Sequence, residues 1–148
     1  MVPKDSGGPS PAGALQAIAF GAVAITTRAL QTVGLELTFV QWRVLVIVGA
    51  TNDGLTVSEI AARIGSELSP TSRLVARMAR RGLVTLVKED VDRRVTRVTL
   101  SSEGRRVRQS VLERRLALLV AVLAAAGPIS PEVVAGLQRI GDAFAQFT

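Results

Sequence analysis

The 148 residues include no cysteine, no histidine and no tyrosine, and only 3% of them are aromatic. Without cysteine there is no disulfide, no thiolate nucleophile and no thiol redox sensor. Without histidine the imidazole base is missing, and with cysteine gone too, so are the usual zinc ligands. An enzyme would depend on carboxylates or on the two lysines, Lys4 and Lys88. We therefore expect no enzyme, with no catalytic residue, metal site or cofactor.

Long apolar runs are also scarce. The two longest, Ala12–Thr27 and Leu116–Ala126, fall short of the roughly 20 residues that a membrane-spanning helix needs. Lys4 is matched by Asp5, so the start lacks the positive region of a signal peptide. We expect a cytoplasmic protein with no membrane partner, in which both runs form helices buried at a subunit interface.

The positive charge is concentrated in one part of the chain. The net charge is +6, but residues 63–115 hold 14 Lys and Arg against 6 acids, a net +8, and the remainder carries −2. A basic segment of this kind fits a polyanionic partner. The hydrophobic content of 48% with few aromatics indicates a helical protein packed from Ala, Leu, Val and Ile.

Helix and turn signals divide the chain into a disordered tail, residues 1–11, and a single domain, residues 12–148. Two capping boxes, Thr38 with Gln41 and Thr56 with Glu59, mark helix starts. Ser69 before Pro70 predicts another N-cap. Helices are expected over residues 12–32, 39–50, 57–64, 70–81, 102–126 and 131–147.

Two β-branched runs, residues 83–87 and 95–100, read as strands on either side of a charged loop, with a minimal third strand at Leu55. The fold class is therefore mainly α with a small β-hairpin wing. Residues 37–104 would form a winged helix-turn-helix lobe for DNA. Residues 12–36 and 105–148 would be dimerisation helices that flank it.

The helix expected over residues 70–81 has two unlike sides at 100° per residue. Leu74, Val75 and Met78 gather on one side and would dock on the core. The other side collects Ser69, Arg73, Ala76, Arg77 and Arg80. Arginines commonly decorate an ordinary solvated helix face, but such faces usually alternate charge sign. No acid lies between residues 73 and 81, which favours DNA binding.

The first residues of a helix in the major groove reach the base edges. Thr71, Ser72 and Arg73 are therefore the candidates for sequence readout, with Arg73 able to bind guanine bidentately. Thr71 sits toward the core side of the wheel, where it would cap the helix or contact phosphate. Arg77 and Arg80 are better placed for phosphates.

The loop between the strands holds Asp92, Arg93 and Arg94. Arginine suits a narrow minor groove, where the potential is most negative. An acid two residues away can hold the guanidinium in one orientation. The competing interpretation is a solvated hairpin tip that contacts nothing.

Several of these motifs, taken in order, resemble the MarR (multiple antibiotic resistance regulator) family. They are Leu37-Thr38 with Gln41, residues 55–61 (LTVSEIA), 77–84 (RMARRGLV), 92–94 (DRR) and 100–104 (LSSEG). The resemblance implies a homodimeric winged-helix transcriptional regulator, usually a repressor released by a small ligand. Residues 71–77 would match the recognition helix, Arg94 the wing arginine and Asp92 the acid that orients it. Pro70-Thr71 departs from the family's usual small polar and apolar pair.

The resemblance also implies an effector pocket beside the DNA-binding lobe. Without cysteine, oxidant sensing by a thiol is excluded, and without histidine a zinc site of the family's type is not expected. Phe20, Phe39, Trp42 and Arg43 are the candidates to line a pocket for a small aromatic or amphipathic effector. The competing interpretation makes the three aromatics plain core, because large aromatics commonly fill cores.

These expectations combine into a homodimer that presents two recognition helices to a pseudo-palindromic operator on double-stranded DNA. Half-sites would lie about 34 Å apart, one turn of the duplex. Two rival functions stay open on the sequence alone. One is an architectural or effector-independent DNA-binding protein, and the other is a winged-helix protein-interaction module.

Overall fold

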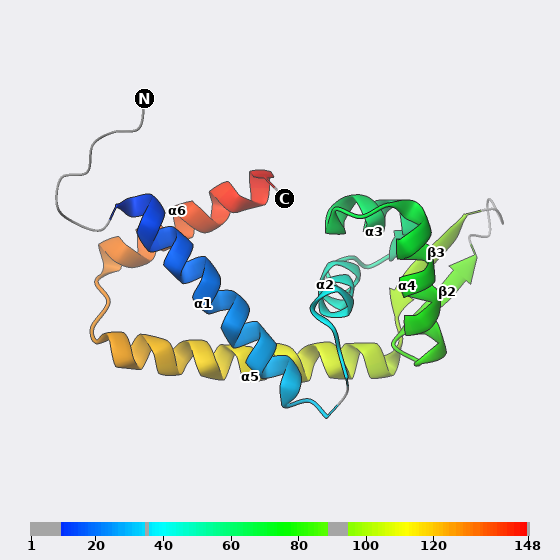
Figure 1. The fold of residues 1–148 in the computed structure, drawn as a ribbon, viewed down its shortest axis with the longest axis horizontal. Helices are drawn as coiled ribbons and strands as arrows, with labels where there is room; N and C mark the ends of the chain where they lie inside the picture. The colour runs from blue at the N-terminus through cyan, green and yellow to red at the C-terminus, as the bar shows by residue number, and fades with distance from the viewer. Residues whose placement is uncertain (1–9, 35, 89–94, 148) are drawn as a thin grey trace.

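The computed structural model describes residues 10–34, 36–88 and 95–147 (Figure 1). Helices dominate, and one small antiparallel sheet joins them, so the expected class of a mainly α fold with a hairpin wing is confirmed. The elements follow one another as α1 (Pro11–Gln31), α2 (Phe39–Val48), β1 (Leu55–Thr56), α3 (Val57–Ile64), α4 (Leu68–Arg80), β2 (Val84–Lys88), β3 (Thr96–Leu100), α5 (Ser102–Ala126) and α6 (Pro131–Phe147).

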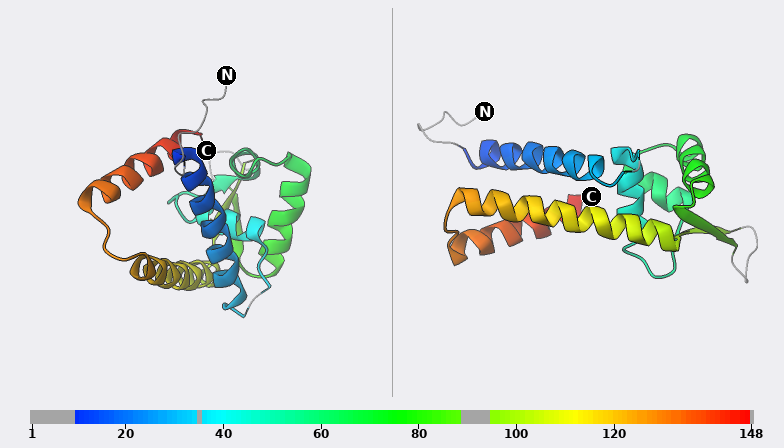
Figure 2. Two further views of the ribbon diagram at one scale, coloured as in Figure 1. Left: turned by 60° about the vertical axis from the view of Figure 1, so that its left-hand side comes forward. Right: turned by 90° about the horizontal axis from the view of Figure 1, so that it is seen from below.

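The molecule has two ends joined by α5, the longest helix. The helices α2, α3 and α4 and the sheet form a compact lobe around the start of α5, while α1 and α6 lie toward its other end (Figure 1). Helix α1 crosses α5 and contacts it (Figure 1 and Figure 2). The sheet order is β1-β3-β2, with Leu55 opposite Val98 and Val84 opposite Leu100.

The hydrophobic core lies inside the lobe. Its largest fully buried side chains include Leu45, Ile60, Met78 and Val98, contributed by α2, α3, α4 and β3. In α5 only the first turns are buried, through Gly104, Val107 and Val111. None of the side chains described in α6 is buried, and α1 buries residues only near its C-terminal end. The core therefore fixes α4 and the wing and leaves the far end of the molecule uncovered.

Both predicted capping boxes are present. The Thr38 hydroxyl accepts from the Gln41 backbone N–H at 3.2 Å, and the Gln41 side chain accepts from the Thr38 N–H at 3.0 Å. Thr56 and Glu59 repeat the exchange at 3.2 and 2.7 Å. Since an N-cap contributes about 1 kcal/mol, these motifs define where α2 and α3 begin.

The predicted N-cap of the recognition helix is wrong. Ser69 lies inside α4, which begins at Leu68 after Glu67, and the Glu67 side chain makes no capping hydrogen bond. Pro70 occupies the first turn, where backbone N–H groups have no helical partner, so its missing N–H costs nothing there. The N–H and the hydroxyl of Thr71 both donate to the Glu67 carbonyl, at 3.3 and 2.8 Å, so the first turn of α4 begins after Glu67.

The end of α4 is locked to the start of α5. Gly82 has a φ of +69°, and the N–H groups of Gly82 and Leu83 donate to Ala79 and Met78, which is a Schellman ending. The Ser101 hydroxyl donates to the Gly82 carbonyl and accepts from the Gly104 N–H. The recognition helix is therefore held at its C-terminal end by the LSSEG segment.

The apolar helix α1 is longer than the run identified from the sequence. It spans 21 residues and is apolar enough to cross a membrane by length and composition, so the earlier argument from a short run does not apply to it. Its C-terminal part packs on α5, where Ala29 and Leu30 are buried and the Thr26 hydroxyl accepts from Arg115 at 2.9 Å.

Candidate nucleic-acid interface

The two sides predicted for the recognition helix are both present in α4. Thr71, Leu74, Val75 and Met78 are buried against the lobe. The opposite side is exposed along the whole helix and carries Ser69, Ser72, Arg73, Arg77 and Arg80. Helix α4 lies at the outer edge of the lobe, next to the wing strands (Figure 1). Because the core fixes its apolar side, its polar side faces solvent.

Thr71 does not share that exposed surface. Its side chain is 1% exposed, and its hydroxyl is used within the first turn by the bond to the Glu67 carbonyl. The expectation that Thr71 reads bases does not fit this placement. Ser69, Ser72 and Arg73 are the residues of the first turns that remain accessible.

The exposed side of α4 is uniformly cationic. The helix contains no acidic residue, and in the described part of the chain Arg73, Arg77 and Arg80 form no ion pair. Ion pairs of the lobe lie elsewhere, as between Arg106 and Glu103 on α5. Three unneutralised guanidinium groups on one face give a strong positive potential at this edge.

Arg81 has a different role from the three arginines before it. Its guanidinium donates to the Glu36 carbonyl at 2.9 Å and to the Gln41 side chain at 3.4 Å. Gln41 is itself buried and completes the capping box of α2. Arg81 thus ties the end of α4 to the start of α2. Sequence reasoning missed these contacts of Arg81, because its partners lie 40 and 45 residues away along the chain.

Arg43 also holds the DNA-binding lobe together. It donates to the carbonyls of Arg63 and Ile64, at 2.9 and 3.4 Å, where α3 ends at Gly65. A cation at a helix C-terminus satisfies orphan carbonyls and complements the helix dipole. Because α3 leads directly into α4, this contact helps to set the angle between the two helices of the helix-turn-helix.

The wing strands are in the expected order. Pairing runs from Val84 with Leu100 to Lys88 with Thr96. The loop residues proposed for the minor groove, Asp92, Arg93 and Arg94, lie outside the residues that the structure describes. Lys88, the last residue of β2, is exposed.

A second interaction braces the sheet against α3. Arg97 on β3 lies 3.9 Å from the Glu59 carboxylate and donates to the Gly54 carbonyl at 3.5 Å. The Thr56 backbone N–H holds the pKa of Glu59 below 4.5, and the Thr56 hydroxyl and Arg97 lower it further. Glu59 is therefore ionised in the folded lobe at neutral pH, where it caps α3 and attracts Arg97.

Three of the four predicted effector residues lie together. Phe39, Trp42 and Arg43 line a hollow of about 220 Å³ between α1, α2 and α5, called here the aromatic hollow. Its other walls are Thr26, Val46, Ile47, Leu112 and Arg115. Phe20 is not among them. It lies in the N-terminal half of α1 and is 69% exposed.

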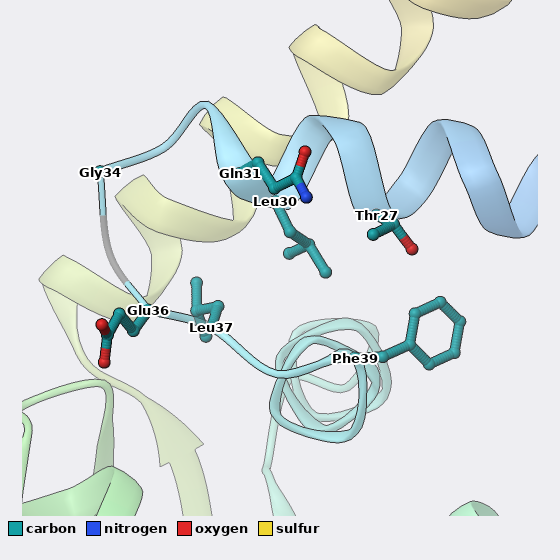
Figure 3. Close-up of a pocket in the computed structure, with 7 residues that line it drawn as sticks. All are labelled: Thr27, Leu30, Gln31, Gly34, Glu36, Leu37 and Phe39. Carbon is teal, nitrogen blue, oxygen red and sulfur yellow. The ribbon is translucent and has the colours of Figure 1, made fainter.

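The alternative interpretation, that the aromatics are plain core, fits only Trp42. That side chain is 4% exposed and packs in the core cluster, while Phe39 is 40% exposed. Phe39 extends from the first turn of α2 beneath α1, on the side of Thr27 (Figure 3). There it also borders a neighbouring hollow of about 440 Å³.

Comparison with known proteins agrees with this geometry. The family model described as MarR family matches residues 35–95. YsmB of Bacillus subtilis (strain 168), an uncharacterized HTH-type transcriptional regulator, is 38% identical over 61 residues. That match covers 41% of this chain and 42% of YsmB, less than half the length of either.

Solved structures resemble the chain over nearly its whole length. A MarR family protein from Bacillus stearothermophilus is 29% identical, with a TM-score of 0.74 over 89% of this chain and 88% of that one. CouR from Rhodococcus jostii RHA1, solved bound to p-coumaroyl-CoA, is 25% identical, with a TM-score of 0.71 over 95% and 96%.

The helix-turn-helix, the wing strands and the flanking helices together define a winged-helix protein. The sequence motifs, the family model and the structural likeness all point to the same class of winged-helix protein, the MarR family of transcriptional regulators. Residues 35–95 match the model of the MarR family, and the chain resembles solved MarR family structures over nearly its whole length.

Proposed function

We propose that the chain acts in the cytoplasm as a homodimeric, sequence-specific transcriptional regulator of double-stranded DNA, a repressor that a small molecule releases. The observation that carries the proposal is the exposed side of α4, which presents three arginines and no acid next to the wing strands.

The exposed side chains suit two kinds of DNA contact. Ser72 and Arg73 lie in the first half of α4, the part of a recognition helix that reaches base edges. Arg73 would bind guanine O6 and N7, a contact that discriminates by about 1–3 kcal/mol. Arg77 and Arg80, one and two turns further along, would contact phosphates and set the register. The wing residues Asp92, Arg93 and Arg94 would extend the contact to the minor groove.

Selection of bound sequences from random duplex DNA tests this assignment. We expect an enriched pseudo-palindrome with half-sites about one turn apart, because a two-fold dimer presents two α4 helices. Arg73→Ala should relax preference at one base pair of each half-site, and Arg114→Ala, an equal charge loss on α5, should not. Enrichment of no sequence, with duplex still bound, would favour an architectural protein. Absence of duplex binding at low salt would favour a protein-interaction module.

Dimerisation is proposed because the helical end of the molecule leaves large apolar side chains uncovered. A monomer rarely exposes so extensive an apolar surface. These side chains are Ile18, Phe20 and Val23 on α1, Leu116, Val120 and Leu123 on α5, and Val133, Leu137 and Ile140 on α6. A second copy would cover them with the same surface, as a two-fold interface requires.

Light scattering coupled to size exclusion tests the dimer directly. The account requires twice the chain mass of 15.6 kDa at micromolar concentration. Leu123→Asp should shift the protein toward monomer, because it would bury a charge in the interface. Asp142→Leu is the control, because it makes the reverse exchange on α6, replacing a charged side chain with an apolar one. A monomeric wild type would end the proposal of a dimer.

Effector release is proposed for the aromatic hollow. It offers Phe39 and Trp42 for ring contact, with Arg43 and Arg115 in its walls for an acid group. CouR, solved with p-coumaroyl-CoA, supports an aromatic acyl ligand in a protein of this fold. Arg43 supplies the link, because an anion that drew it away would free the carbonyls of Arg63 and Ile64 at the end of α3.

Benzoate and p-coumarate are the probes for this site. Either should weaken binding to the selected duplex, and Arg43→Leu should abolish that response while keeping the ring contacts. A wild-type affinity that neither acid changes at millimolar concentration would favour effector-independent DNA binding.

A further inference from the structure

A second, more polar hollow lies at the C-terminal end of α2. It has a volume of about 480 Å³ and is formed by the C-terminal end of α2, the turn before β1, the end of β3 and the first turns of α5. Its polar walls are Thr51, Asn52, Thr99, Arg105, Arg108 and Gln109, and we call it the arginine hollow. It shares no lining residue with the aromatic hollow, and α4 contributes none.

The charge of this hollow is unbalanced. Two arginines face four neutral hydrogen-bonding side chains, and none of the described residues that line it is acidic. One N–H of Arg105 donates to the Leu100 carbonyl at 2.8 Å. This bond anchors the guanidinium and leaves its other N–H groups available to a ligand. A concave site with two cations and no acid attracts an anion.

Arg108 carries the sharper signal. Its Nε is buried and has no hydrogen-bond partner among the described residues. Leaving a buried donor unsatisfied costs about 1–3 kcal/mol, and more for a charged group, so native proteins rarely keep one without a reason. A small shift of the side chain would bring this donor within reach of an oxygen ligand in the hollow.

Gly49 leaves the space that the Arg108 side chain occupies. A Cβ added at Gly49 would lie 2.7 Å from both Cδ and Nε of Arg108, and 2.8 Å from a methyl of Leu100. The arginine stem therefore lies directly across the Gly49 backbone, in space that any side chain at that position would fill.

We propose that the arginine hollow binds a small oxyanion, a phosphoryl or carboxylate group of a free metabolite. The planar edge of Arg108 would bind two oxygens bidentately, as guanidinium does with phosphate and carboxylate. Arg105 would supply the second charge, and the Thr99 hydroxyl would complete the shell. The site stands apart from the DNA contact of α4 and from the effector site, so it does not rest on the proposed function.

Thermal unfolding with added anion tests the proposal. Inorganic phosphate and malonate would be titrated against chloride at matched ionic strength, into wild type, Arg108→Gln and Arg114→Gln. Arg114 is the matched control, since it is an exposed arginine of the same helix outside the hollow. We expect a saturable rise of Tm in wild type and Arg114→Gln, with affinity at least tenfold weaker in Arg108→Gln.

Stability without anion gives an independent readout. Because Arg108 Nε is a buried donor without a described partner, Arg108→Gln should not lower the Tm of the anion-free protein. If that variant fails to fold, Arg108→Lys carries the test, because it keeps the charge and loses the bidentate edge. It should bind phosphate more weakly than wild type. Equal anion responses in wild type and variants, or no response to phosphate and malonate, would overturn the proposal.

Duplex binding separates a free anion from a DNA phosphate. Arg108→Gln should keep the wild-type dependence of duplex affinity on salt. If the variant reduces the slope of the logarithm of the duplex binding constant against the logarithm of salt concentration by about 1, Arg108 contacts the DNA backbone, and the proposal of a free-anion site is overturned. If the wild type binds no duplex, the proposed function fails. The phosphate titration still decides whether the arginine hollow binds an anion.

Discussion

Gly104→Ala should destabilise the protein strongly, although alanine is the better helix former. Gly104 lies in the first turn of α5, against the Leu83 carbonyl that follows the end of α4. A Cβ at this position would come within 1.9 Å of the Leu83 oxygen and 3.0 Å of its carbon. Ordinary contact begins at 3.4 Å, so the helix start has to move by about 1.5 Å.

The magnitude follows from two opposing terms. Alanine gains about 0.5–1 kcal/mol over glycine inside a helix. Overpacking costs about 1–3 kcal/mol, and the upper end applies because the neighbour is backbone and cannot rotate away. The net loss should be about 2 kcal/mol, or a Tm lower by about 4–8 °C for a chain of this length. Because Ser101 and Gly104 also hold the end of α4, duplex affinity should fall as well.

Urea unfolding followed by circular dichroism measures this loss. Ser102→Ala, at the exposed first position of the same helix, is the control and should stay within about 0.5 kcal/mol of wild type. A Gly104→Ala protein as stable as wild type would refute the close packing of α5 on Leu83. It would also weaken the account of how α4 is held.

Other substitutions test single contacts. Glu59→Gln keeps the capping box but removes a carboxylate whose folded pKa lies below 4.5. The stability that its ionisation contributes is present above pH 4.5 and lost as the pH falls through the folded pKa. In urea titrations, the difference in stability between wild type and this variant should therefore shrink between pH 7 and pH 3. A constant difference would contradict the assignment. Thr71→Val should leave base preference in duplex selection unchanged, since the side chain is buried; a relaxed preference would return Thr71 to the interface. Arg43→Leu should lower amide protection in α3 by about 1 kcal/mol in hydrogen exchange, with protection in the distant α6 as the reference; equal protection would mean that the α3 carbonyls do not depend on it.

Much of the fold was predictable because local signals coincide with tertiary ones. The capping boxes at Thr38 and Thr56 define helix starts through bonds only three residues apart, and Gly82 needs only its own positive φ to end α4. The exposed arginine side of α4 followed from helical periodicity, because buried Leu74 and Met78 leave only one side free.

The errors and omissions have different causes. The start of α4 was misplaced because Ser69-Pro70 is a strong local signal, while Thr71 bonding back to Glu67 shifts the helix upstream. The bond from Arg81 to Glu36 spans 45 residues, and no local pattern reveals it. Phe20 was grouped with Trp42 on residue type alone, although α1 carries it away from the lobe.

The salt dependence of duplex affinity tests the central claim, that the arginine side of α4 binds DNA. For the selected duplex, the logarithm of the binding constant should fall steeply with the logarithm of salt concentration, by about 0.9 per phosphate contact. Arg77→Ala should reduce that slope by about 1 and weaken all sequences alike, while Arg114→Ala leaves it unchanged. A wild-type slope near zero, or an Arg77→Ala slope equal to that of wild type, would contradict the account.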